Sequence, residues 1–163
     1  MMKKLTGLIL IFILARMHTF AGDNNVLFPT FSLLKMDSTS YLTEKDLKDS
    51  VSTVFINFSP TCDHCERTIK SILENISKFT ETQFVLSSFE DFAAIRKFYF
   101  DNGLNSFTTV FIGQETDYSL TKQIKYSSFP CLIFFDKYKK YLKKIDEESN
   151  AKEILKTLKL KYK

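Results

Sequence analysis

The chain has 163 residues, 44% of them hydrophobic, and only three prolines and four glycines. This composition is that of a folded domain with its own core, and it excludes a disordered or linker-rich chain. Residues 1–21 hold three basic residues and no acidic one, so the formal net charge of +4 falls to +1 over the remainder, with 20 basic against 19 acidic residues. Net charge therefore gives no support for nucleic-acid binding.

The first 21 residues have the pattern of a signal peptide. Two lysines precede an apolar run of eleven residues, 5–15, which is too short to span a bilayer, since that takes roughly 20 residues. Thr19 and Ala21 place small residues at the −3 and −1 positions of a cleavage site before Gly22. We therefore expect an exported protein of the periplasm or cell envelope, attached to the membrane only if this segment is retained.

The apolar pattern predicts alternating strands and helices along the rest of the chain. Extended segments are expected at residues 28–34, 51–58, 83–87, 108–112, 131–135 and 141–145. Helices are expected at residues 63–79, 88–99 and 118–124 and from residue 149 onward, with a helical turn at 43–47.

Polar residues mark the expected ends of these elements. Thr43, with Asp46 three residues later, is expected to cap the helical turn, and Ser88 and Ser149 are expected to cap two of the helices. Asn102-Gly103 ends the helix that Ser88 begins. Alternating strands and helices imply a largely parallel sheet covered on both faces, and the last two strands form a hairpin that adds an antiparallel edge. The expected fold class is α/β, with a central mixed β-sheet flanked by helices.

The most informative motif, Cys62-Asp63-His64-Cys65, lies where the strand at 51–58 gives way to the helix at 63–79. Two cysteines one helical turn apart can close a disulfide with little backbone movement. The first lies at the helix N-terminus, where unpaired N–H groups and the positive end of the helix dipole favour a thiolate. Because the thiolate attacks disulfides, the motif predicts thiol–disulfide chemistry.

Four stretches together resemble the thioredoxin-like, redoxin-type thiol:disulfide oxidoreductases of bacteria. They are the signal segment and residues 55–65, 128–131 and 134–137. The resemblance extends over about residues 28–160. It implies a thioredoxin-like domain at residues 51–163, with residues 22–50 as an N-terminal extension made of a short strand and a turn.

The resemblance also implies a role for each residue of the site. Cys62 is the exposed attacking thiolate, and Cys65 is the more buried thiol that resolves the mixed disulfide. Pro130 follows Phe129 through a cis bond, which leaves the Phe129 backbone open to an extended substrate segment. The only cofactor expected is the Cys62–Cys65 disulfide. The expected partners are protein thiols and disulfides and a redox partner protein, without nucleic acid.

The two residues between the cysteines are expected to tune the reduction potential in opposite directions. A protonated His64 stabilises the reduced thiolate and makes the disulfide a stronger oxidant. The negative charge of Asp63 beside Cys62 favours the thiol instead. We therefore expect a potential between those of strong reductants and strong oxidants.

Three positions depart from the family pattern. Thr61 precedes the motif where many relatives have Trp, and Ile56 and Asn57 stand where thioredoxin has a buried Asp that manages the proton of the second cysteine. Glu66 or water is the alternative proton acceptor. Cys131 directly follows Pro130, where it is either a competing thiol or, as we expect, a small buried core residue.

Other readings of the Cys-x-x-Cys motif remain open. Thr61 to Cys65 before an amphipathic helix also resembles the loop of copper and heavy-metal carriers, since thiolates suit Cu(I). Pro60 replaces the Met usual in those carriers. A thioredoxin-fold binding module with an inert disulfide is a second alternative. A peroxiredoxin-type site is a third, but Phe55 stands where its upstream proline is expected.

Overall fold

The structure, a computed structural model, describes residues 26–160, so the expected signal segment lies outside the described residues. Within this range the strands are β1 Ser32–Leu34, β2 Tyr41–Thr43, β3 Ser52–Asn57, β4 Thr82–Ser88, β5 Val110–Gln114, β6 Cys131–Phe135 and β7 Tyr141–Ile145. The α-helices are α1 Asp63–Glu74, α2 Phe92–Asp101, α3 Ser119–Gln123 and α4 Ala151–Leu158. Short 3-10 helices lie at Glu44–Asp46 (η1), Ile76–Lys78 (η2) and Leu104–Ser106 (η3).

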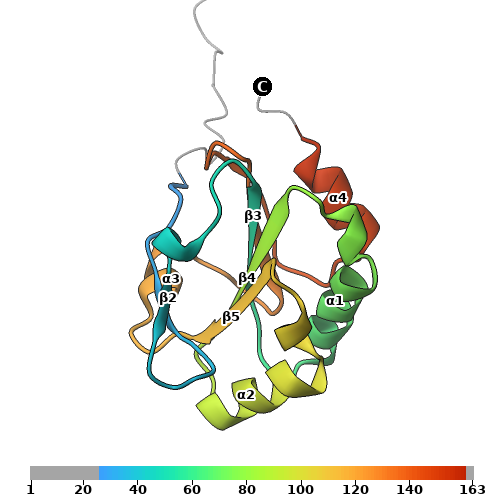
Figure 1. Cartoon of the computed structure of the whole chain (residues 1–163). Helices are drawn as coiled ribbons and strands as arrows, with labels where there is room; N and C mark the ends of the chain where they lie inside the picture. Colours follow the sequence, from blue (N-terminus) through green and yellow to red (C-terminus); the bar gives the residue numbers. More distant parts are fainter. Residues whose placement is uncertain (1–25, 161–163) are drawn as a thin grey trace, which may run out of the picture.

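All of these strands join one sheet, in the order β2-β1-β5-β4-β3-β6-β7. Strands β3, β4 and β5 are parallel, and β6 runs antiparallel to both β3 and β7. At the other edge β1 is antiparallel to β5 and β2. The mixed central sheet predicted from the sequence is therefore confirmed, and β3 lies near its middle (Figure 1).

The two faces of the sheet carry separate cores because side chains alternate along each strand. One core joins α1, α2 and α4 to residues such as Val54 and Ile56 of β3. The other joins Leu120 of α3 and the N-terminal strands to Phe55 and Cys131. The sheet is thus covered by helices on both faces, with α1 and α4 on the same face (Figure 1).

The N-terminal extension adds β1 and β2 on one side of the same sheet, and β2, at the edge, is a strand that the sequence did not predict. Leu34 of β1 pairs with Gln114 of β5. Gly113 makes this approach possible: a Cβ built there would lie 2.6 Å from Cβ of Leu33 and 2.9 Å from the carbonyl oxygen of Leu34. Glycine is therefore required where the extension meets the central strands.

Several expected helix boundaries are corrected by the structure. Helix α1 ends at Glu74 rather than continuing to residue 79. Ser88 ends β4, and Asp91 caps α2 by accepting hydrogen bonds from the backbone amides of Ala93 and Ala94. Asn150, not Ser149, caps α4, where its Oδ1 accepts from the Glu153 amide at 3.1 Å.

Other predicted ends are confirmed. Thr43 and Asp46 form a reciprocal capping box on η1. Asn102 follows the last residue of α2, and Gly103 has φ 61°, a left-handed conformation that suits glycine.

Candidate functional site

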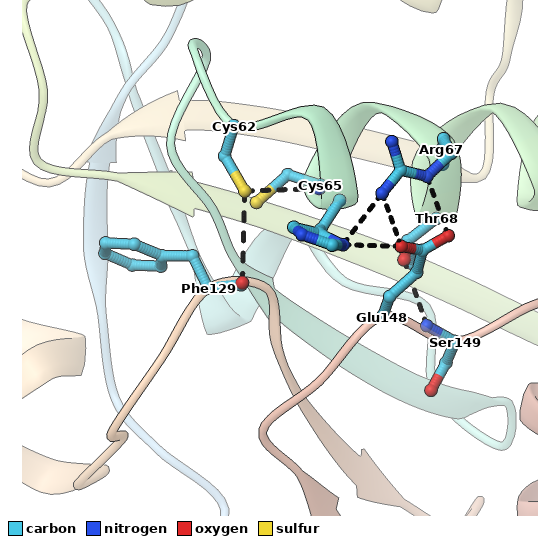
Figure 2. A network of polar contacts seen from close by, with 8 residues as sticks. Cys62, Cys65, Arg67, Thr68, Phe129, Glu148 and Ser149 are labelled. Carbon is cyan, nitrogen blue, oxygen red and sulfur yellow. Dashed lines mark hydrogen bonds and ion pairs between the residues drawn. The ribbon is translucent and has the colours of Figure 1, made fainter.

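Cys62 lies at the N-terminus of α1, just after the chain leaves β3. Its backbone is extended, with φ −95° and ψ 113°, and its amide donates to the Ser59 carbonyl at 3.1 Å. The Cys62 sulfur accepts a hydrogen bond from the backbone amide of Cys65 at 3.4 Å (Figure 2). The cysteine itself therefore acts as the helix N-cap, so its sulfur lies against the unpaired N–H groups that favour negative charge.

The two cysteines differ sharply in environment. Cys62 is partly exposed, whereas Cys65 is 0% exposed and packs in the core beneath α1. Burial raises the pKa of the Cys65 thiol from its ordinary value of 9.0 to about 12, and its hydrogen bond with Cys62 adds to the shift. Cys65 is thus held as a neutral thiol behind the accessible sulfur of Cys62.

The loop before β6 approaches the same sulfur from the other side. The Phe129-Pro130 peptide bond is cis, as the sequence resemblance implied. The Phe129 carbonyl oxygen lies 3.9 Å from the Cys62 sulfur and accepts from it (Figure 2). The sequence-predicted residues Cys62, Cys65, Phe129 and Pro130 therefore come together at one end of the sheet.

An aromatic row extends away from Cys62 along this loop. The Phe129 ring lies 5.5 Å from the Tyr126 ring and 5.9 Å from the Phe89 ring, measured between centroids. Phe89 in turn lies 5.9 Å from Tyr118, which is 48% exposed. The row could not be predicted from the sequence, because its members come from three separate connecting segments.

A charged cluster borders the motif on the side away from the aromatic row. Glu148 lies in the segment between β7 and α4. Its carboxylate accepts hydrogen bonds from Arg67 Nε at 2.9 Å and from Arg67 Nη2 at 2.7 Å (Figure 2). Its Oε2 also lies 2.6 Å from Nδ1 of His64. These hydrogen bonds, from Arg67 first and His64 second, lower the pKa of Glu148 to about 2. The carboxylate therefore stays charged over the physiological pH range.

The start of this segment also holds the loop that contains the cis peptide bond. Asp146 Oδ2 accepts from Ser127 Oγ at 3.1 Å and from Lys144 Nζ at 2.9 Å. Ser128 Oγ donates to the Asp146 carbonyl oxygen. Residues 146–148 consequently contact both the motif and the loop before Pro130. These contacts could not be predicted from the sequence, because no local pattern marks residues so far apart in the chain as neighbours.

Alternation along β3 decides which residue faces the buried thiol. Ile56 points to the face covered by α1, in the same core as Cys65. Asn57 points to the opposite face, where its side chain donates to Ser87 Oγ at 3.1 Å. Glu66, the other candidate for handling the Cys65 proton, pairs with Lys70 at 2.6 Å on the exposed side of α1. The side chain that β3 presents to Cys65 is therefore apolar.

The third cysteine lies on the other side of the sheet from the motif. Cys131 is fully buried in the core that includes Phe55 and Leu120, whereas Cys65 belongs to the core beneath α1. Burial raises the pKa of the Cys131 thiol strongly, and a hydrogen bond with Asp146 adds to the shift. Its expected place as a small core residue is confirmed.

Within residues 26–160, no group of three or more His, Cys, Asp or Glu side chains is arranged to hold a metal ion. In the same part of the chain, no helix combines the length and apolarity needed to cross a bilayer.

Comparisons with known proteins identify the fold. The sequence matches no family model, and no curated protein sequence is similar to it. Among solved structures, a thioredoxin-like protein from Aeropyrum pernix superposes with a TM-score of 0.64 at 15% identity, over 80% of this chain and 88% of that one.

Two further structures come from proteins outside the cytoplasm. A secreted Mycobacterium tuberculosis disulfide oxidoreductase, homologous to E. coli DsbE, has a TM-score of 0.64 at 14% identity, over 78% of this chain and 93% of its own. The exposed lipoprotein thioredoxin Etrx1 of Streptococcus pneumoniae has a TM-score of 0.61 at 20% identity, over 80% of this chain and 98% of its own. The predicted thioredoxin-like fold is therefore confirmed.

Proposed function

We propose, from the thioredoxin-like fold and the geometry around Cys62, that this protein is a thiol:disulfide oxidoreductase that acts on protein substrates. The observation that carries the proposal is the pairing of a partly exposed cysteine at a helix N-terminus with a buried cysteine one turn behind it. A helix N-terminus favours the thiolate that attacks disulfides. A buried neutral thiol suits the second, resolving step.

In the reducing direction the Cys62 thiolate attacks one sulfur of a substrate disulfide. The new S–S bond joins Cys62 to the substrate, and the other substrate sulfur leaves as a thiolate that takes up a proton. Cys65 then loses its proton and attacks the Cys62 sulfur, which breaks the mixed disulfide and releases the second substrate thiolate. Two electrons pass from the dithiol to the substrate, and the reverse sequence oxidises a substrate dithiol.

The loop beside Cys62 supplies a place for the substrate backbone. The Phe129 carbonyl lies 3.9 Å from the Cys62 sulfur, so an extended segment carrying the reacting cysteine can pair with Phe129 as an added strand. The aromatic row of Phe129, Tyr126, Phe89 and Tyr118 lies beside that path and favours apolar or aromatic side chains next to the substrate cysteine.

The expected signal segment supports a working place in the cell envelope, where dithiols can cycle. The secreted and surface-exposed nature of two structural neighbours points the same way. Determining the N-terminal residue of the mature protein tests this part: a chain that begins at Gly22 supports export, and a cytoplasmic full-length chain contradicts it.

Trapping of intermediates tests the chemistry. Cys65→Ser should accumulate a mixed disulfide between Cys62 and a protein substrate, because the resolving thiol is gone. Cys62→Ser should trap nothing. Cys131→Ser is the matched control and should behave like the parent, since Cys131 lies in the other core. Equal trapping by both motif variants, or failure of the parent to reduce insulin or oxidise a dithiol peptide, would contradict the proposal.

A further inference from the structure

Arg67 and Glu148, together with His64 of the motif, form the charged cluster that bears most directly on the chemistry of the two cysteines. The Glu148 carboxylate binds Arg67 through two hydrogen bonds and lies 2.6 Å from His64 Nδ1. Both of its partners belong to the first turns of α1, while Glu148 itself comes from the segment before α4. A residue 83 positions beyond Cys65 in the sequence thus fixes the charged groups around the motif.

Nδ1 of His64 lies 2.6 Å from Glu148 Oε2 and 2.8 Å from Arg67 Nη2. A carboxylate oxygen only accepts, so the contact with Glu148 is a hydrogen bond when Nδ1 carries a proton, as it does in the charged imidazolium. His64 and Arg67 then share Glu148 Oε2 as a common acceptor. Glu148 therefore sets both the orientation of the imidazole and its hydrogen bonding.

The same carboxylate cancels part of the positive charge near the reactive sulfur. The pKa of Arg67 is raised, mainly by its hydrogen bond with Glu148 and to a smaller extent by the charges of Asp63 and Cys62. The guanidinium is therefore within electrostatic reach of the Cys62 sulfur. Without Glu148, its charge would act on a Cys62 thiolate without compensation.

We infer that Glu148 is a positioning residue that sets the reduction potential of the Cys62–Cys65 pair, holding it below the value that Arg67 and His64 alone would give. The inference rests on the proposed function in that it assumes that the pair cycles. The neighbouring charges on α1 are Asp63, beside Cys62, and the Glu66–Lys70 pair, which balances itself on the exposed side of the helix.

The test is the substitution Glu148→Gln, which removes the charge and keeps the shape. The reduced thiolate gains stability, so the equilibrium constant with glutathione should move toward the reduced protein by about three- to tenfold, or roughly 15 to 30 mV for this two-electron couple. The chain has no Trp, so the redox state is measured by acid quenching, alkylation and intact mass rather than by fluorescence. Glu147→Gln, the same charge change at the exposed adjacent residue, is the control and should leave the equilibrium within twofold of the parent.

A second variant and a second measurement separate tuning from structural support. Arg67→Gln removes a positive charge and should shift the equilibrium in the opposite direction. Denaturation of the oxidised and reduced forms of Glu148→Gln should show that the reduced form gains stability relative to the oxidised form. Equal losses in both forms with an unchanged equilibrium would mean a purely structural ion pair and would overturn the inference, as would a shift of the wrong sign.

The glutathione equilibrium uses no protein substrate, so its result is independent of the proposed activity. A parent protein that exchanges with glutathione but neither reduces nor oxidises protein substrates would contradict the proposed function and leave the role of Glu148 measurable.

Discussion

The buried thiol of Cys65 makes the stability of the reduced protein depend on pH in the alkaline range. In the folded protein its pKa is about 12, against an ordinary value of 9.0 that applies once the chain unfolds. The unfolded chain therefore releases this proton first, and rising pH favours the unfolded state. The stabilisation is complete below about pH 9 and is lost progressively as the pH rises toward 12.

The size of the effect follows from the two pKa values. Between pH 7 and pH 10 the reduced protein should lose about 1.4 kcal/mol of unfolding free energy through Cys65 alone. The assay is urea denaturation followed by far-UV circular dichroism at several pH values, in the presence of a phosphine reductant. Cys65→Ala is the comparison, because it lacks the titrating thiol. The cavity left by this substitution lowers the unfolding free energy by the same amount at every pH. Any change in the pH dependence therefore comes from the loss of the titrating thiol.

The oxidised parent provides a second comparison, since a disulfide has no proton to release. The slope due to Cys65 should be present in the reduced parent and absent from both the oxidised parent and Cys65→Ala. Cys131, whose pKa is also raised by burial, contributes equally to all three and cancels. Parallel pH profiles of the reduced parent and Cys65→Ala between pH 7 and pH 10 would refute the reasoning that Cys65 is held as a neutral thiol.

Two further predictions concern the fold and the substrate surface. Gly113→Ala should lower the unfolding free energy by about 1 to 3 kcal/mol, because the added methyl lies within 2.6 Å of Leu33 and separates β1 from β5. Thermal unfolding measures this, and an unchanged midpoint would contradict the close approach. Phe89→Ala should lower kcat/KM for protein disulfides by roughly threefold to tenfold through loss of an apolar contact, with little change in the rate with oxidised glutathione. Equal losses with both substrates would instead point to a disturbed Phe129 loop.

Much of the fold could be predicted from the sequence, because local patterns of apolar and capping residues mark most of its strands and helices. The bounds of β6 and β7 agree with the predicted hairpin, and the capping box at Thr43 follows from two residues three apart. The strand β2 was missed because its three residues have too little alternation to distinguish a strand from a polar connection. Helix caps were misplaced by one to three residues because serine competes with Asp91 and Asn150 for the same role.

The candidate site divides in the same way. Cys62 and Cys65 were accessible because they form a short motif between a strand and a helix, and Phe129 and Pro130 were accessible through the family resemblance. Glu148 and the aromatic row were not, because their relation to the motif exists only after the sheet has formed and α4 has docked on α1. Tertiary contacts of this kind leave no periodicity in the sequence.

The position of Ile56 bears on how the resolving step proceeds. A carboxylate at this place on β3 would lie under α1 and could accept the Cys65 proton from within the core, whereas Asn57 on the opposite face has no such access. A polar residue on β3 can take the Cys65 proton only if its side chain lies on the face covered by α1. A shift of one residue along a strand moves the side chain to the opposite face, so the polar side chain of Asn57 does not replace a carboxylate at position 56. In the proposed mechanism the Cys65 proton therefore goes to water or to the departing substrate sulfur rather than to a side chain of β3. Because a less basic thiolate leaves faster, resolution of the mixed disulfide should be fastest for substrate cysteines of low pKa.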